Sequence, residues 1–347
     1  MHQLKIVSAI LISIILAGCG GGGSNSDLPA KPRFTSQVSF GDSLSDVGSY
    51  KVGPILAAGG GQFTINAASA TPPTLTNWTE LTAASLGLGT CAALTGGFGV
   101  VPVAHPGCFG YAEGGARVTL QPGVGNTDST LGPGSGAMTV PVLQQIQNHL
   151  AAITGNKFSG SELVLVMAGA NDVFTQAAYV AASAVSPASA VAAVQTAAAE
   201  LANDVKTQII ANGAKYVVVA NIPDIGQTPY GVSLGANVAL IDTLVSAFNA
   251  QLKADLPDSP NVLNVDAFTA SGDEVANPAK YNLSNVIAPA CNIAALPNNS
   301  SLFCTPSTLI PAVDAHYLYA DAVHPTPYGY ALFATYILQA MTNKGWY

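Results

Sequence analysis

Four short hydrophobic runs along the chain have the length and composition of buried strands. They occupy residues 38–40, 163–167, 216–220 and 262–265, and each contains Val. The runs at 163–167 and 216–220 show no alternation of polar and apolar residues, which is typical of strands buried on both faces. Such strands occur in parallel sheets, so the pattern predicts a sheet covered by helices on both sides.

Between these runs, hydrophobic residues recur every three or four positions, which is the period of an amphipathic helix. The longest such pattern begins at Ser186-Pro187 and ends before Asn212-Gly213. The same period predicts further helices at 78–86 with Asn77 as its cap, at 139–150 with Thr139 as its cap, at 240–252 and at 326–341. Because strands alternate with helices, we predict an α/β fold with right-handed crossovers.

The composition is that of a folded domain with long loops. Of 347 residues, 49% are hydrophobic and 9% are charged, which suits one large domain with a substantial core, placed here at 33–347. The 35 Gly and 22 Pro imply many turns. We expect the Gly-rich segments 52–76 and 87–137 to be loop insertions, and a short strand within the second to end near 111–117.

The first residues have the features of an export signal. A basic start precedes the apolar run 6–16, which is too short to span a membrane and has the length of a signal-peptide core. Leu16-Ala17-Gly18-Cys19 resembles a bacterial lipobox, which implies removal of residues 1–18 and lipidation of Cys19. The alternative is an ordinary secretory signal with an incidental cysteine. Residues 19–32 would form a flexible tether, and Gly20 favours, by the same resemblance, an outer-membrane lipoprotein.

The charge of the chain bears on its partners. The formal net charge is -8, and loss of residues 1–18, which contain one Lys and no acid, takes it to -9. No basic cluster occurs in the sequence, so nucleic-acid binding is not expected. The sequence does not indicate an oligomeric state.

Lipidation of Cys19 would leave four cysteines, and an even number in an exported chain suggests disulfides. Three pairings are possible. We favour the sequence neighbours, Cys91 with Cys108 and Cys291 with Cys304, because both pairs would close short loops. Each would add ~3 kcal/mol to stability in the chain-entropy description. Four buried free thiols are the alternative.

A candidate nucleophile follows the first predicted strand. Gly41-Asp42-Ser43 places a serine at the sheet edge where open α/β sheets bind ligands. A serine needs a base, most often a histidine that an acid orients. Asp321 lies three residues before His324 and can reach it within one turn, whereas Asp314, two residues before His316, forms the competing pair. Taken singly, each of these residues is more often a turn, surface or core residue.

Four short motifs, in this order, resemble the SGNH or GDSL hydrolase family. They are Gly41-Asp42-Ser43-Leu44, Gly115, Gly169-Ala170-Asn171-Asp172 and Asp321-Ala322-Val323-His324. The resemblance covers roughly residues 36–341. It implies a three-layer α/β/α, flavodoxin-like sandwich with a mostly parallel sheet, and ester hydrolysis without a cofactor.

By this resemblance, Ser43 would be the nucleophile, His324 the general base and Asp321 the acid that orients it. The oxyanion donors would be the backbone N–H groups of Ser43 and Gly115 and the side-chain amide of Asn171. Each such donor can lower the barrier by ~3–4 kcal/mol. The remaining acids in these motifs and just after the first of them are expected to brace loops: Asp42, Asp46 and Asp172.

Several functions fit these motifs. The first is a serine esterase or lipase at the cell surface, acting on acylglycerols, lysophospholipids or short-chain acyl esters, with the loop insertions lining an acyl pocket. The second is a polysaccharide O-deacetylase, and the third is a non-catalytic binding lipoprotein on the same fold. The fourth is a metal site at Asp314, His316, Asp321 and His324. Because no helical His-Glu-x-x-His pattern is present, no metal is predicted.

Overall fold

The computed structural model describes residues 31–66, 76–126 and 136–347. Residues Pro32–Tyr347 form one compact unit. The predicted signal segment, Cys19 and nearly all of the tether lie outside the described residues, so export and lipidation stay predictions of the sequence. No helix in the described ranges is long and apolar enough to cross a lipid bilayer.

A four-stranded parallel sheet lies at the centre of this unit. Its order is β1 (Ser36–Gly41), β4 (Glu162–Met167), β5 (Tyr216–Ala220) and β6 (Val262–Val265). The register aligns the last residues of all four strands, Gly41, Met167, Ala220 and Val265. All four strands predicted from hydrophobic runs are confirmed, and they share one carboxyl edge.

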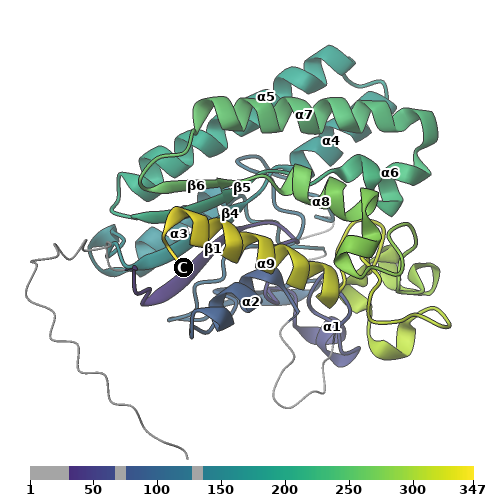
Figure 1. The fold of residues 1–347 in the computed structure, drawn as a ribbon, viewed down its shortest axis with the longest axis horizontal. Helices are drawn as coiled ribbons and strands as arrows, with labels where there is room; N and C mark the ends of the chain where they lie inside the picture. The colour runs from purple at the N-terminus through teal and green to yellow at the C-terminus, as the bar shows by residue number, and fades with distance from the viewer. Residues whose placement is uncertain (1–30, 67–75, 127–135) are drawn as a thin grey trace, which may run out of the picture. The chain divides into compact units, whose positions relative to one another are not determined.

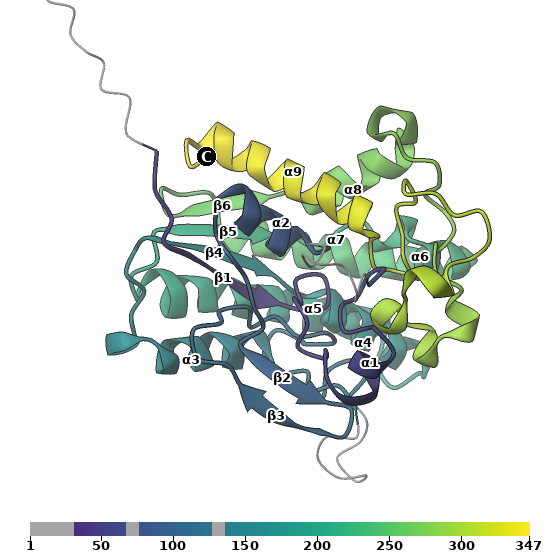
Figure 2. The same cartoon turned by 90° about the horizontal axis from the view of Figure 1, so that it is seen from below.

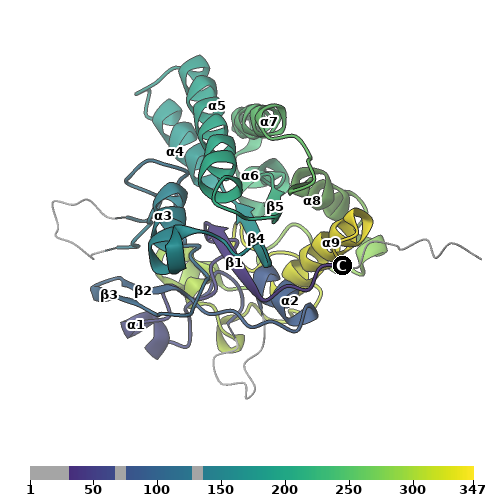
Figure 3. The same ribbon diagram turned by 90° about the vertical axis from the view of Figure 1, so that its left-hand side faces the viewer.

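Helices cover both faces of the sheet, because successive side chains of a strand point to opposite sides. One face, with Val38, Val164 and Val217, packs against α3 (Val142–Ala152), α4 (Ala170–Ala181), α5 (Pro187–Asp204) and α7 (Val238–Asp255). The other, with Leu163, Leu165 and Val218, packs against α2 (Trp78–Ser85), α8 (Ala267–Ala276) and α9 (Pro327–Lys344). Figure 1 and Figure 3 show these layers. The expected three-layer α/β/α sandwich is confirmed.

The helices α2, α5 and α9 begin where the sequence predicts. Asn77 forms a capping box with Glu80, and the hydroxyls of Ser186 and Thr326 accept backbone N–H groups at the starts of α5 and α9. The cap predicted at Thr139 is wrong. The helix α3 begins at Val142 behind Pro141, and the Thr139 hydroxyl bonds to Gln121 instead.

Several elements occupy segments that the sequence left as loop or unassigned. They are α1 (Gly53–Ala57), the antiparallel hairpin β2 (Leu94–Gly97) and β3 (Val100–Ala104), α4, α6 (Pro229–Ser233) and α8. The hairpin lies on the β1 side of the sheet (Figure 2). The strand expected before 111–117 does not form. Gly110 makes only isolated bridges to Ser39 and Ala92, because this Gly-rich segment offers no run of apolar side chains to pack.

Both expected disulfides are present. Cys91–Cys108 flanks the hairpin, and Cys291–Cys304 lies within a stretch of short 3-10 turns. The loops between α8 and α9, coloured yellow-green, gather toward the carboxyl edge of the sheet (Figures 1 and 2). That edge therefore receives both the strand ends and a disulfide-bonded loop.

Candidate active site

Ser43 follows β1 through a tightly constrained glycine. Gly41 has a φ of +154°, and a Cβ there would lie 2.2 Å from the carbonyl oxygen of Met167 in the neighbouring strand. The side chain of Gln145 binds both backbone groups of Gly41, accepting from N–H at 2.9 Å and donating to C=O at 2.8 Å. The sheet edge and Gln145 thus fix the point from which Ser43 projects.

The structure brings Ser43, His324 and Asp321 into one hydrogen-bonded chain. His324 Nε2 lies 2.8 Å from Ser43 Oγ, and Nδ1 lies 2.8 and 2.9 Å from the two Asp321 oxygens. With the Nδ1 proton facing the carboxylate, Nε2 is left to accept the serine proton. Phe63 packs beside the imidazole, with ring centroids 4.9 Å apart. We call these three residues the Ser43–His324–Asp321 chain.

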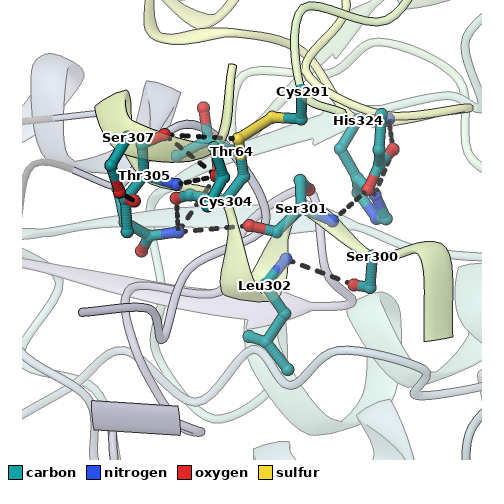
Figure 4. The surroundings of a disulfide bond; sticks show 12 residues. Thr64, Cys291, Ser300, Ser301, Leu302, Cys304, Thr305, Ser307 and His324 are labelled. Atoms are coloured by element: carbon teal, nitrogen blue, oxygen red, sulfur yellow. Dashed lines mark hydrogen bonds and ion pairs between the residues drawn. A yellow bond between two sulfur atoms is a disulfide. The ribbon is translucent and has the colours of Figure 1, made fainter. Parts of the chain in front are cut away.

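Asp321 is 3% exposed, and its carboxylate is held by backbone donors. Its oxygens accept N–H groups from Ser301, Val323 and His324 at 2.8–2.9 Å. Burial alone would raise the pKa of Asp321. The facing His324 and these hydrogen bonds outweigh burial and hold the pKa well below its usual range. Figure 4 shows Ser301 between His324 and the Cys291–Cys304 disulfide. The carboxylate is therefore a fixed negative charge behind the imidazole.

The three residues expected to supply the oxyanion donors, Ser43, Gly115 and Asn171, line one cavity of about 290 Å³. In the described part of the chain, the backbone N–H groups of Ser43 and Gly115 donate to no acceptor. Asn171 gives one amide hydrogen to Ala116 C=O at 2.9 Å, which leaves the other available. At Gly115 φ is +81°, and a Cβ would meet the Val124 carbonyl oxygen at 1.9 Å. Only glycine suits this position.

Buried acids brace the loops that carry these donors. Asp46 accepts backbone N–H groups from Gly48, Ser49 and Gly114, and the Tyr50 hydroxyl donates to Gly114 C=O at 2.7 Å. Gly114, the residue before Gly115, is thus held through both its N–H and its C=O. Burial, only partly offset by these hydrogen bonds, raises the pKa of Asp46.

The other two acids of the motifs are bracing residues as well. Asp172 binds Arg117 Nε and the Val118 N–H, each at 3.0 Å. Asp42 accepts from the Leu44 N–H at 3.1 Å, and burial raises its pKa to about 7. Reasoning from the sequence missed Gln145 and Tyr50, because a single glutamine or tyrosine in a helix or loop carries no distinguishing pattern.

The competing pair, Asp314 and His316, lies apart from the Ser43–His324–Asp321 chain. The Asp314 carboxylate binds the backbone N–H of His316 and the hydroxyl of Ser284, while the His316 ring packs on Tyr328 at 4.7 Å. Neither Asp314 nor His316 lines a cavity with Ser43. Among the residues that the structure describes, no three His, Cys, Asp or Glu side chains gather as metal ligands. The four-residue metal site considered from the sequence does not assemble.

The comparison with protein families agrees with this geometry. The model of the GDSL-like Lipase/Acylhydrolase family matches residues 38–337. The chain belongs to this family. Membership places it among hydrolases of the esterase, lipase and acylhydrolase type, and it accounts for the α/β fold. A search of curated proteins found no match to the chain.

Proposed function

We propose that the protein is a serine esterase that hydrolyses carboxylic esters through a covalent acyl intermediate. The observation that carries the proposal is the continuous hydrogen-bonded chain from Ser43 Oγ through His324 to the buried Asp321. Nucleophile, base and orienting acid are in contact, as this chemistry requires. A binding protein on the same fold would need none of these contacts.

In the first half of the reaction, Ser43 Oγ attacks the ester carbonyl carbon while His324 Nε2 takes its proton. The carbonyl oxygen becomes negative and accepts hydrogen bonds from the Ser43 and Gly115 N–H groups and from Asn171. Collapse of this intermediate breaks the bond to the alcohol, which leaves with the proton from His324. A water molecule then repeats these steps on the acyl-serine, releasing the acid and restoring Ser43.

The test is the Ser43→Ala variant, assayed on aryl esters graded by acyl length. Removing the nucleophile from such a unit can lower turnover on the order of a millionfold. The melting temperature should stay unchanged, because Ser43 lies in a loop and not in either core. A variant that keeps a tenth of the activity would contradict the proposal. Acetylated xylan in the same panel separates a polysaccharide deacetylase, which would prefer it to every aryl ester.

A further inference from the structure

A second, smaller cavity adjoins Ser43 and His324 on the side of α8 and is about 90 Å³ in volume. Ser43, Asn171 and His324 line both this cavity and the larger one. An ester carbonyl at Ser43 therefore has one space on each side for its acyl and alcohol parts. The larger cavity is lined by Phe63, Phe98, Leu302 and Phe303, which suit an acyl chain.

The smaller cavity contains carboxyl groups without a basic partner. Asp224 and Glu274, 9% and 8% exposed, both line it, and no Lys or Arg is among the described residues of its wall. The Glu274 carboxyl has no hydrogen-bond partner in the described part of the chain. The Asp224 carboxyl accepts one hydrogen bond, from the Gln227 amide at 2.6 Å. Burial, followed by the charge of Asp273, raises the pKa of Glu274 to about 8, as expected for a carboxyl that lacks a counter-charge.

Asp42, Thr228 and Ser271 also line this cavity, and most of the remaining wall is apolar and aromatic. Tyr319 lines the same cavity as both carboxyls, and burial together with the charges of Glu274 and Asp224 raises the pKa of its phenol. Further apolar side chains complete the wall, including Leu44, Phe174, Ile225, Leu318 and Phe333. A carboxyl with a raised pKa ionises more readily when a cation binds beside it, so a group that fits here should be cationic and also tolerate hydrocarbon contacts. An alkylammonium ion meets both requirements, since its methyl groups pack on apolar and aromatic surfaces.

We infer that the smaller cavity binds an alcohol part that carries a small alkylammonium group, so that choline-like esters are preferred substrates. This inference rests on the proposed esterase function. A neutral alkyl group of the same shape would gain no charge interaction with Glu274 and Asp224, and an anionic group would be repelled. The preference is a matter of charge rather than size.

The experiment compares two substrates of matched shape, butyrylcholine and 3,3-dimethylbutyl butyrate, in which carbon replaces the ammonium nitrogen. The wild-type kcat/KM should be at least about tenfold higher for the cationic ester, which is the usual scale of a desolvated cation–carboxylate and cation–π contact. Glu274→Gln and Asp224→Asn should each reduce this ratio several-fold. The control is Asp314→Asn, which removes the same charge from an exposed site and should leave the ratio unchanged.

Tetramethylammonium chloride offers a test that needs no variant. It should inhibit the wild-type enzyme competitively, whereas sodium chloride at the same ionic strength should not. Equal kcat/KM values for the two esters, or a ratio that Glu274→Gln leaves intact, would overturn the inference while hydrolysis of the neutral ester upholds the esterase function. Failure to hydrolyse any ester would overturn both.

Discussion

The two ends of the Ser43–His324–Asp321 chain are held in different ways. Ser43 comes directly from a strand of the central sheet, with Gly41 packed against β4 and bound by Gln145. Asp321 and His324 come from the loop region between α8 and α9, which contributes no strand to the sheet. The position of the proposed nucleophile thus depends on the core of the domain, and that of the proposed base depends on loop contacts.

The disulfide Cys291–Cys304 is central to those loop contacts. Cys291 N–H donates to Ala320 C=O at 3.0 Å, one residue before Asp321. Cys304 closes the 3-10 turn that begins at Ser301, whose N–H donates to Asp321 Oδ2 at 2.8 Å. The Cys291–Cys304 disulfide therefore links the segment that carries Asp321 to the turn that binds its carboxylate (Figure 4). The disulfide and these hydrogen bonds brace a loop that does not join the sheet.

The largest effects on kcat are expected from substitutions within the Ser43–His324–Asp321 chain. His324→Ala should lower kcat by on the order of 10⁵ or more, because Ser43 loses its base, and Asp321→Asn by about 10⁴, because the imidazole loses its orienting charge. His316→Ala is the control, since its ring packs on Tyr328 away from Ser43. Its kcat should stay within about threefold of wild type, with any effect confined to KM.

Steady-state kinetics of the three variants on one soluble ester, together with their melting temperatures, test which histidine is the base. An inactive His316→Ala beside an active His324→Ala would reverse the assignment of the base.

Opening the disulfide next to Asp321 should have an intermediate effect. In the double variant Cys291→Ser, Cys304→Ser, the Ser301 donor is less firmly placed, and a hydrogen bond to a charged group is worth about 1.5–3 kcal/mol. Partial loss of that bond should lower kcat about tenfold, with KM much less affected. The matched control is Cys91→Ser, Cys108→Ser, which opens a loop of similar length beside the hairpin.

Both double variants should melt at lower temperature, since each loses a cross-link worth ~3 kcal/mol. Only the first should lose turnover when assayed well below both melting temperatures. If the two variants lose kcat equally, the Cys291–Cys304 bond has no special relation to Asp321.

The same contrast explains which features could be predicted from the sequence. Residues 163–167 and 216–220 specify buried strands by an unbroken apolar pattern. The motif after the run 38–40 locates Ser43, and the motif after 163–167 locates Asn171. Asp321 and His324 are local to each other, so three-residue spacing suffices to pair them. The donors from Ser301, Gln145 and Tyr50 could not be found, because contacts between residues distant in sequence leave no local pattern. The helix α4 was missed because its start carries the Gly169–Asp172 motif instead of a helix cap.

The smallest effect on turnover is expected on the nucleophile side. Gln145→Met keeps the volume of this buried side chain but removes its hydrogen bonds to Gly41 N–H, Gly41 C=O and Val140 C=O. The Glu113 N–H still donates to Gly41 C=O at 3.2 Å. Gly41 N–H and Val140 C=O lose their side-chain partner, at a cost of about 1–3 kcal/mol for each buried group. The β1–β4 pairing still places Gly41 and the turn to Ser43, so kcat should change by no more than about threefold. We therefore expect a clear fall in the melting temperature with nearly normal kinetics. A variant that melts like wild type but loses a hundredfold in kcat would show that Gln145, and not the sheet, positions Ser43.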